Sequence, residues 1–259
     1  MRISIIVPSL NQAAFIGRAL ESIFSQQGDF DLECLVLDGG STDGSIDVIR
    51  AFATRAAGSK IAFQWRSEPD RGQSDAINRG LAAASGDLIA YLNSDDMYAP
   101  DALDEVARAV RATGALWVTG PTTIVDADDR PIQRAVNAYR NLWLRRYSYR
   151  KLLMLNFVPQ PSTFWTREAL DQIGTFNEQL HYTMDYDYWL RLGRIGDPIV
   201  LDRPLSRFRI HGGSKGGTRY AAQFEEGRNV MRRYTTSRGI RLFHGVHSQL
   251  IVLAYRIFK

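Results

Sequence analysis

The chain lacks the features that mark secreted and membrane-spanning proteins. Among its 259 residues there is one cysteine, Cys34, so no disulfide can form within the chain and a reducing compartment is expected. No apolar run reaches the roughly 18 to 20 residues that a spanning helix needs. The first apolar run is broken at Pro8, before it attains the length of a signal-peptide core. These absences predict a soluble or peripheral protein of the cytoplasm.

Two phosphate-binding signatures are also missing. No Gly-x-Gly-x-x-Gly follows an expected strand, and the Gly-rich loop at 212–217 lacks the Gly-Lys-Ser/Thr order of a P-loop. A dinucleotide-dependent oxidoreductase is therefore disfavoured. The net charge of +4 is compatible with an anionic ligand or membrane surface but too small to indicate nucleic acid, so no nucleic-acid partner is expected.

What is present is a regular alternation of strands and helices. Continuous apolar runs predict buried strands. The segments between them have apolar residues at helical spacing, or many small residues, and are predicted to be helices. The expected strands are 3–7, 32–37, 61–65, 88–92, 116–118, 199–201 and 205–210, with a hairpin at 122–133. The expected helices are 14–24, 45–56, 72–84, 101–113, 167–173, 185–195, 220–238 and 241–257. This rhythm predicts an α/β protein with a mostly parallel, doubly wound sheet flanked by helices.

Two adjacent carboxylates, Asp95 and Asp96, follow the strand expected at 88–92 directly. Open α/β sheets bind ligands at the carboxyl ends of their strands. Oxygen ligands suit Mg²⁺ or Mn²⁺, which keeps positions free for substrate phosphates. A plain helix cap is the alternative, but Asp101 already offers one near Pro100. We therefore interpret the pair as a metal and phosphate site.

Other candidates have plausible structural roles as well. Asp38 ends a strand and could accept hydrogen bonds from a ribose or base, or simply form the turn. Asp185 and Asp187 open a helix, where one could cap it and the other act as a general base. His211 after a strand is by itself more typical of an ordinary loop histidine. Arg71 before a helix could bind an anion or lie on the surface.

Taken together, the motifs resemble those of family 2 glycosyltransferases. They occur in the expected order over about residues 3–215 and are specific only jointly. The motifs are Ile-Ile-Val-Pro-Ser-Leu-Asn at 5–11, Asp-Gly-Gly-Ser-Thr-Asp-Gly at 38–44, Asp-Ala-Ile-Asn-Arg-Gly at 75–80, Gly-Asp-Leu-Ile-Ala-Tyr-Leu-Asn-Ser-Asp-Asp at 86–96, Asp-Tyr-Asp-Tyr-Trp-Leu-Arg-Leu at 185–192 and Arg-Phe-Arg-Ile-His at 207–211.

The resemblance implies a GT-A fold and inverting transfer of a sugar from a nucleotide diphosphate sugar, of UDP type, to a saccharide or lipid-linked saccharide. It implies Asp96 and His211 at an Mg²⁺ or Mn²⁺ ion, and Asp185, or else Asp187, as the base. The implied nucleotide and donor contacts are Pro8, Ser9, Asn11, Asp38, Arg71, Ser94 and Asp95. Residues 1–120 would form the nucleotide-sugar half, 121–217 the acceptor and catalytic half, and 218–259 a helical extension on the acceptor side.

Three positions depart from the family pattern. Gly39 stands where many relatives have a second Asp, Asn93 where an acid is common, and Met184 where Glu is usual, so the choice between Asp185 and Asp187 stays open. A Gln-x-x-Arg-Trp signature is missing, which favours single addition over processive synthesis. A sugar nucleotidyltransferase is an alternative, but residues 8–12 lack its Gly-rich basic loop, and a non-catalytic nucleotide-sugar-binding protein is another.

An aromatic and basic stretch at 139–155 and the C-terminal helices suggest contact with an anionic membrane near a lipid-linked acceptor. That contact would place the protein at the inner face of the plasma membrane, in surface polysaccharide or glycolipid assembly. Ordinary core packing, a solvated face or a dimer contact explains the same amphipathic pattern equally well. The oligomeric state is not predicted.

Overall fold

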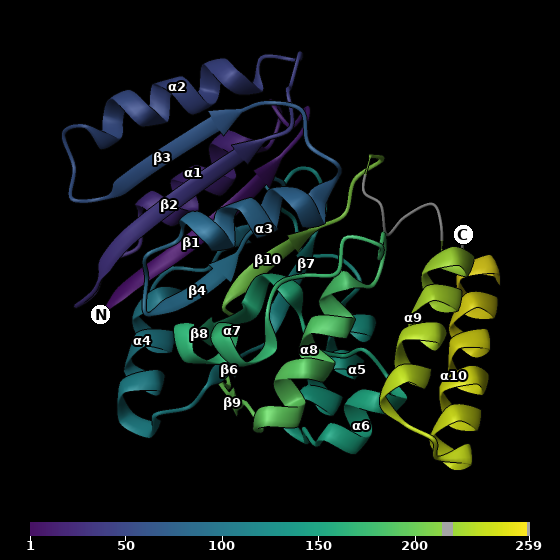
Figure 1. The fold of residues 1–259 in the computed structure, drawn as a ribbon. Helices are drawn as coiled ribbons and strands as arrows, with labels where there is room; N and C mark the ends of the chain where they lie inside the picture. The colour runs from purple at the N-terminus through teal and green to yellow at the C-terminus, as the bar shows by residue number, and fades with distance from the viewer. Residues whose placement is uncertain (214–219, 258–259) are drawn as a thin grey trace.

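The structure is a computed structural model that describes residues 1–213 and 220–257 (Figure 1). Its centre is a seven-stranded sheet in the order β3-β2-β1-β4-β8-β6-β9. Strands β1 to β4 run parallel, whereas β8 is antiparallel to both β4 and β6. The strands are β1 Arg2–Ser9, β2 Asp31–Asp38, β3 Ala62–Ser67, β4 Leu88–Tyr91, β6 Trp117–Thr119, β8 Thr163–Thr166 and β9 Ile199–Val200.

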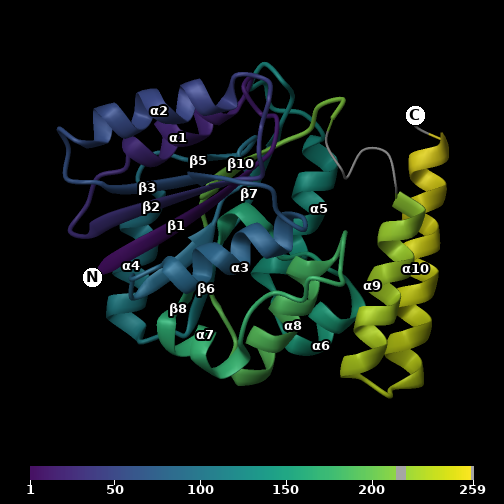
Figure 2. The ribbon, with the colours of Figure 1, turned by 45° about the horizontal axis from the view of Figure 1, so that its top comes forward.

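Helices cover both faces of this sheet, which Figures 1 and 2 show from two angles. Ile3 and Ile5 of β1 pack on α1, α2 and α4, while Ile6, pointing the other way, packs on α3. This alternation follows from the two-residue period of a strand and explains why β1 is apolar throughout. The helices before residue 174 are α1 Ile16–Phe24, α2 Ser45–Ala56, α3 Gln73–Ala83, α4 Ala102–Thr113, α5 Arg134–Arg145, α6 Tyr149–Met154, the 3-10 turn η1 Gln160–Ser162 and α7 Arg167–Ile173.

A second sheet of three short strands lies beside the first, in the order β5-β10-β7. β10 (Ser206–Arg209) pairs antiparallel with β5 (Met97–Tyr98) and parallel with β7 (Thr122–Val125). Because β5 follows the Asp95–Asp96 pair directly, this pairing brings the end of β10 next to the two carboxylates. The sheet therefore positions two segments more than 100 residues apart at one place.

Three helices complete the chain: α8 Met184–Ile195, α9 Tyr220–Tyr234 and α10 Arg238–Ile257. α9 packs on α8, and α10 packs on α9 and α6. In the part of the chain that the structure describes, no helix combines the length and apolar character needed to cross a bilayer.

The expected strand and helix alternation and the doubly wound α/β sheet are confirmed. The hairpin expected at 122–133 is only half right, because its turn forms but only 122–125 is a strand. Pro131 makes a single antiparallel bridge to Val125, and the strand pairs with β10 instead. Proline has no N–H to donate to a ladder, so a second strand arm cannot extend through it. The expected Gly-rich loop at 212–217 lies mostly outside the described residues.

Candidate active site

The first part of the site is the paired ends of β1 and β2. Ser9 lies opposite Asp38 in the parallel ladder, and Gly39 donates its N–H to the Ser9 carbonyl at 2.8 Å. Asn11, at a φ of +53°, accepts a hydrogen bond from the backbone N–H of Thr42. Pro8, Ser9, Asn11 and Asp38 are thus brought together as expected.

Asp38 is buried and its oxygens already have partners. They accept hydrogen bonds from the backbone of Gly40 and Ser41 and from the hydroxyls of Ser41 and Ser67, at 2.5 to 3.1 Å. The turn-forming role is therefore fulfilled, and a nucleotide contact by this carboxylate stays a prediction. By contrast, the buried hydroxyl of Ser9 has no hydrogen-bond partner among the residues that the structure describes.

The second part is the turn between β4 and β5. Asp96 is buried, and its oxygens accept hydrogen bonds from the Arg209 backbone N–H at 2.8 Å and from the Asn93 side chain at 3.2 Å. Asp95 is more accessible, and its Oδ2 lies 3.1 Å from Nε2 of His211. Ser94 is buried in the same turn. The structure therefore brings Asp95, Asp96 and His211 together, with Asp95 rather than Asp96 facing the histidine.

Burial raises the pKa of the Asp96 carboxyl well above its usual range, and the neighbouring charge of Asp95 raises it further. A divalent cation would reverse this effect, because positive charge favours the ionised form. Among the described residues no three acidic, His or Cys side chains converge on one point. A carboxylate pair with one imidazole nonetheless suits Mg²⁺ or Mn²⁺, which uses few protein ligands when it also binds substrate phosphates.

Arg209 holds the turn between β4 and β5, a role that the sequence analysis missed. Its side chain is fully buried; Nε donates to the Asp95 carbonyl at 2.7 Å, and its guanidinium pairs with Asp129. Together with its N–H bond to Asp96, this fixes the turn that carries both carboxylates. The sequence did contain a sign of this role, because Arg209 alternates with apolar residues in a short expected strand. A charged side chain that points inward from a strand needs a buried partner.

The third part is the start of α8. Burial raises the pKa of Asp185 to about 6, against opposing hydrogen bonds from the Tyr186 N–H and the Asn156 side chain. Asp187, only two residues on, accepts hydrogen bonds from the Tyr234 hydroxyl at 2.7 Å and from Nε of Arg191 at 3.1 Å. Asp187 is thus engaged in packing α8, while Asp185 retains a carboxylate with the pKa of a base that works near neutrality.

Asp185 and Asp96 share one buried neighbour, Tyr91. Both Asp185 and Asp96 act on the buried Tyr91 at the end of β4, where their negative charges add to burial in raising the pKa of its phenol. Asn93, two residues beyond Tyr91, accepts a hydrogen bond from Gln73 at 2.6 Å and donates one to Gln160 at 3.0 Å. The departure from an acid at position 93 therefore gives an amide that links α3, the β4–β5 turn and η1.

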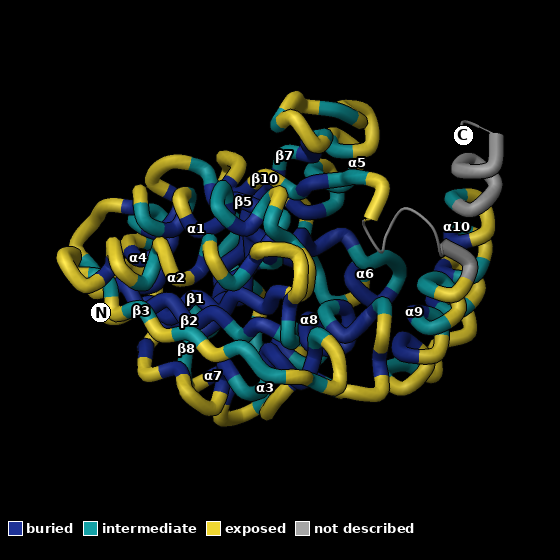
Figure 3. The backbone as a smooth tube through the Cα atoms, turned by 90° about the horizontal axis from the view of Figure 1, so that it is seen from above, coloured by how far each residue is buried: buried dark blue, intermediate teal, exposed yellow. Residues whose placement is uncertain are grey.

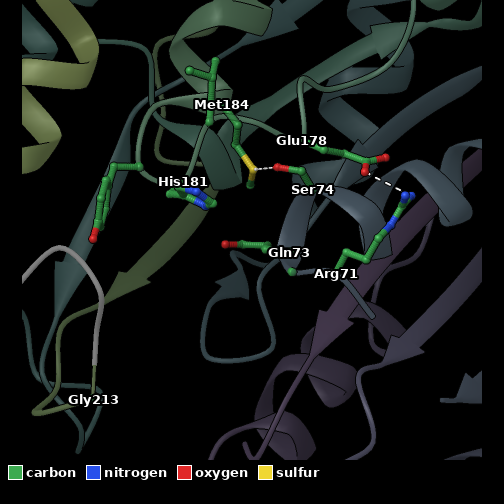
Figure 4. A pocket seen from close by; sticks show the side chains of 10 residues that line it. Arg71, Gln73, Ser74, Glu178, His181, Met184 and Gly213 are labelled. Carbon is green, nitrogen blue, oxygen red and sulfur yellow. Dashed lines mark hydrogen bonds and ion pairs between the residues drawn. The ribbon is translucent and has the colours of Figure 1, made fainter. Parts of the chain in front are cut away.

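A cavity of about 560 Å³ opens beside these groups, between the start of α3 and the segment that precedes α8 (Figure 4). Arg71 lies on one side, where it pairs with Asp75 at 2.8 Å and Glu178 at 3.0 Å. Hydrogen bonds from the Arg71 side chain and backbone hold the pKa of Asp75 down to about 2. No hydrogen bond or ion pair found among the described residues joins Arg71 to the Asp38 turn, so its expected nucleotide contact stays a prediction.

The sulfur of Met184 lies 2.7 Å from the hydroxyl of Ser74 across the same cavity. This contact places the residue before Asp185 against α3, where many relatives are expected to have glutamate. The cavity is thus bounded on the α8 side by an apolar thioether next to the candidate base.

The chain is similar to known proteins in sequence and in fold. The profile described as "Glycosyl transferase family 2" matches residues 4–174. An uncharacterized glycosyltransferase of Nostoc sp. is 34% identical over 136 residues, covering 52% of this chain and 41% of that protein. A PGL/p-HBAD biosynthesis glycosyltransferase of Mycobacterium bovis is 32% identical over 202 residues, covering 77% of this chain and 72% of its own length.

Two solved structures share the fold. S. aureus TarS 1-349 in complex with UDP-GlcNAc has a TM-score of 0.69 at 18% identity, over 89% of this chain and 65% of that one. The mannosyltransferase PcManGT from Pyrobaculum calidifontis, in complex with GDP-Man and Mn²⁺, has a TM-score of 0.69 at 20% identity, over 96% and 69%. The fold is therefore GT-A, as expected. The chain spans less than two thirds of the Nostoc protein and of the TarS chain.

Proposed function

The chain belongs to glycosyl transferase family 2, and from this we propose that it moves a single sugar from a nucleotide diphosphate sugar to an acceptor hydroxyl, with inversion at the anomeric carbon. The observation that carries the proposal is Asp185. Its carboxylate has a pKa raised to about 6, and it lies at the start of α8, whose first residue, Met184, lines the cavity. A base near neutrality beside a cavity is the arrangement that activation of an acceptor hydroxyl requires.

The donor is proposed to be a UDP-type sugar held by the ends of β1 and β2. Support comes from the buried hydroxyl of Ser9, which has no hydrogen-bond partner in the described part of the chain and belongs to the residue opposite Asp38 in the β1–β2 ladder. TarS was solved with UDP-GlcNAc, whereas PcManGT was solved with GDP-Man, so the fold accepts both bases. The acceptor is proposed to be a saccharide or lipid-linked saccharide that enters through the cavity between α3 and α8.

Mg²⁺ or Mn²⁺ would be held by the donor diphosphate together with one or two of Asp95, Asp96 and His211, since no three such side chains converge on one point among the described residues. When bound, the cation supplies charge neutralisation for the diphosphate leaving group, worth several kcal/mol. Asp95 and His211 are the more accessible of these side chains, while Asp96 lies behind them against Arg209. The relative with GDP-Man and Mn²⁺ supports this choice of ion by analogy of fold.

The steps assigned to this chain's own residues are few. The β1–β2 turn binds the nucleotide, and Arg209 keeps the carboxylate turn rigid. Asp185 accepts the acceptor proton as the hydroxyl oxygen attacks the anomeric carbon from the face opposite the leaving diphosphate. Such general-base help accelerates a reaction by about 10² to 10⁴-fold.

Asp185→Asn tests the assignment. We expect transfer to fall by about 10² to 10⁴-fold, while the affinity for nucleotide diphosphate with Mn²⁺, measured by calorimetry, stays near that of the parent. Asp47→Asn, an exposed acid in the first turn of α2, is the matched control and should keep full activity. Wild-type transfer by Asp185→Asn would show that another group is the base.

The donor is identified by screening nucleotide sugars for Mn²⁺-dependent hydrolysis and thermal stabilisation. A response to at least one donor is expected. A chain that binds no nucleotide sugar, or that makes one from a sugar phosphate and a nucleoside triphosphate, would contradict the proposed transfer.

A further inference from the structure

The surface of α10 is unusual because aliphatic side chains lie on its outer face over the residues whose burial is described. Ile240, His244 and Ser248, one turn apart, point inward and are buried. Leu242, Val246 and Leu250 lie on the opposite side and are 69%, 49% and 59% exposed. A surface helix in water normally buries its aliphatic residues. Two polar side chains lie on the inner side and three aliphatic side chains on the outer side. This arrangement indicates that the outer face contacts a less polar environment than water.

The exposed apolar area continues onto α5. Val136, Tyr139 and Leu142 are exposed there at helical spacing. The two helices are joined where the Tyr139 hydroxyl lies 2.7 Å from Nε2 of His247, and the two rings stack. We define the α5–α10 face as Val136, Tyr139, Leu142, Leu242, Phe243, Val246 and Leu250. Figure 3 shows the outer side of α10 largely exposed over its described residues.

The distribution of charged residues indicates which kind of partner the α5–α10 face contacts. Residues 134–154 and 227–259, which contain α5, α6, the end of α9 and α10, hold 13 Lys and Arg and no Asp or Glu. The remaining residues hold 19 Lys and Arg against 28 Asp and Glu, a net charge of −9. The molecule is therefore divided into an acidic body and a strongly basic end, which carries the exposed aliphatic and aromatic side chains.

We propose that the α5–α10 face rests on an anionic lipid bilayer, with its apolar side chains at the headgroup boundary and the surrounding arginines on the lipid phosphates. Basic helices with exposed Leu, Phe and Tyr bind membranes in this way. A nucleic acid would use the charge but not the aliphatic stripe, and a second copy of this chain would bring like charge against like.

Vesicle sedimentation tests this proposal with the intact chain. Sedimentation is expected with phosphatidylcholine vesicles that contain phosphatidylglycerol, and not with phosphatidylcholine alone. Leu242→Gln/Val246→Gln should weaken vesicle binding by about tenfold or more. Arg232→Gln/Arg233→Gln should weaken it by about fivefold for each arginine removed, and added salt should weaken it further.

Leu10→Gln removes a leucine that is 52% exposed outside this face, and Arg50→Gln removes an exposed arginine of α2; both controls should bind as the parent does. The substituted positions are exposed, so the melting temperature of each variant should equal that of the parent. Equal binding by the α10 variant and the Leu10 control would overturn the proposal. The proposal would also be overturned if the parent did not bind vesicles. A parent that forms a dimer and binds no vesicles, with a Leu242→Gln/Val246→Gln variant that is monomeric, would show that the face is a dimer contact instead.

An independent observation concerns the start of α8. Thr183, the residue before the helix, makes no side-chain cap. Instead Glu226 of α9 accepts hydrogen bonds from the backbone N–H groups of His181, Tyr182 and Thr183 at 2.8 to 2.9 Å, and from the Thr183 hydroxyl at 2.8 Å. These bonds hold the pKa of Glu226 below its usual value despite partial burial.

Resting on the proposed function, we infer that Glu226 is a positioning residue that fixes Asp185. One carboxylate holds three consecutive backbone N–H groups, and the last of them lies two residues before the base. Charge at this place is also favoured by the dipole of α8. The C-terminal helices would therefore act on catalysis without touching substrate.

Glu226→Gln tests this role, with its exposed neighbour Glu225→Gln as the control of equal charge change. We expect kcat to fall about tenfold or more with the donor KM and nucleotide affinity unchanged, and amide exchange at 181–183 to accelerate. Unchanged kcat in Glu226→Gln would overturn the inference, as would equal loss of kcat, donor affinity and melting temperature. If the parent transfers no sugar, the proposed function fails whatever Glu226 does. In that case, unchanged amide exchange at 181–183 in Glu226→Gln would show that Glu226 does not fix the start of α8.

Discussion

At the scale of single residues, position 185 is distinguished from 187 by its surroundings. The two acids are two residues apart on α8, but Asp187 is tied to Tyr234 and Arg191, whereas Asp185 keeps a raised pKa. A carboxylate of this kind is protonated at mildly acidic pH and ionised at neutral pH. The same burial that suits it to accept a proton also makes its ionised form costly to the fold.

The first prediction is a pH dependence of turnover. Because the proposed base, Asp185, would act as its ionised carboxylate, kcat should fall on the acidic side with an apparent pKa near 6. The measurement is kcat from pH 5 to 8 at saturating donor, with folding followed by circular dichroism. An acid limb near pH 4 would contradict the assigned pKa.

The second prediction concerns stability. The folded pKa of Asp185 lies above the unfolded value, so its ionised form opposes folding, and this cost grows as pH rises towards and through 6. Asp185→Asn lacks that charge and should raise the free energy of unfolding by about 1 to 2 kcal/mol above pH 7. Urea unfolding at pH 5 and pH 8 measures it, and the gain should shrink at the lower pH.

At the scale of elements, buried carboxylates tie distant segments together. Glu33 of β2 accepts hydrogen bonds from the Ser4 hydroxyl of β1 and from the backbone and hydroxyl of Ser85, between α3 and β4. Gly86 in turn donates to the Ser4 hydroxyl. One side chain thus links β1, β2 and the α3–β4 connection at the amino ends of the parallel strands, opposite the candidate active site.

The third prediction follows from this link. Glu33→Ala should lower the free energy of unfolding by about 2 to 4 kcal/mol, because buried donors lose a charged acceptor. Hydrogen bonds lower the pKa of Glu33, so its contribution is present at neutral pH and is lost as pH falls through the folded pKa. Asp31→Ala, at the exposed start of β2, should change stability little in the same urea titration.

The sequence predicted local features well and long-range ones poorly. The uninterrupted apolar runs of β1 and β2 determine buried parallel strands, so those elements followed from composition alone. The position of β10 did not, since nothing local says that Arg209 must meet Asp95 across a second sheet. Glu226 was likewise invisible, because it serves backbone groups 43 to 45 residues away.

At the scale of the whole molecule, the single thiol offers a direct measure of global opening. Cys34 is fully buried within the core on the α1, α2 and α4 side of the sheet, and burial raises the pKa of its thiol. Reaction therefore requires β2 to separate from the core. The rate of labelling can report on unfolding of the body independently of the C-terminal helices.

The fourth prediction uses this property. Labelling of Cys34 by a disulfide reagent at neutral pH should be slow in the native protein and complete in denaturant. Leu242→Gln/Val246→Gln, on the outer face of α10, should leave the native rate unchanged, whereas Glu33→Ala should raise it. Rapid labelling of the native parent would show that β2 is not buried in solution.

The contact between Glu226 and the start of α8 has a consequence for biosynthesis. Domains begin to fold from the amino end while the ribosome still adds about 5 to 20 residues per second. The sheet, both carboxylate turns and Asp185 itself emerge before residue 226 does. A nascent chain can therefore bind its nucleotide sugar before the helix that bears the base is anchored. Full competence for transfer is expected only after residue 226 has emerged.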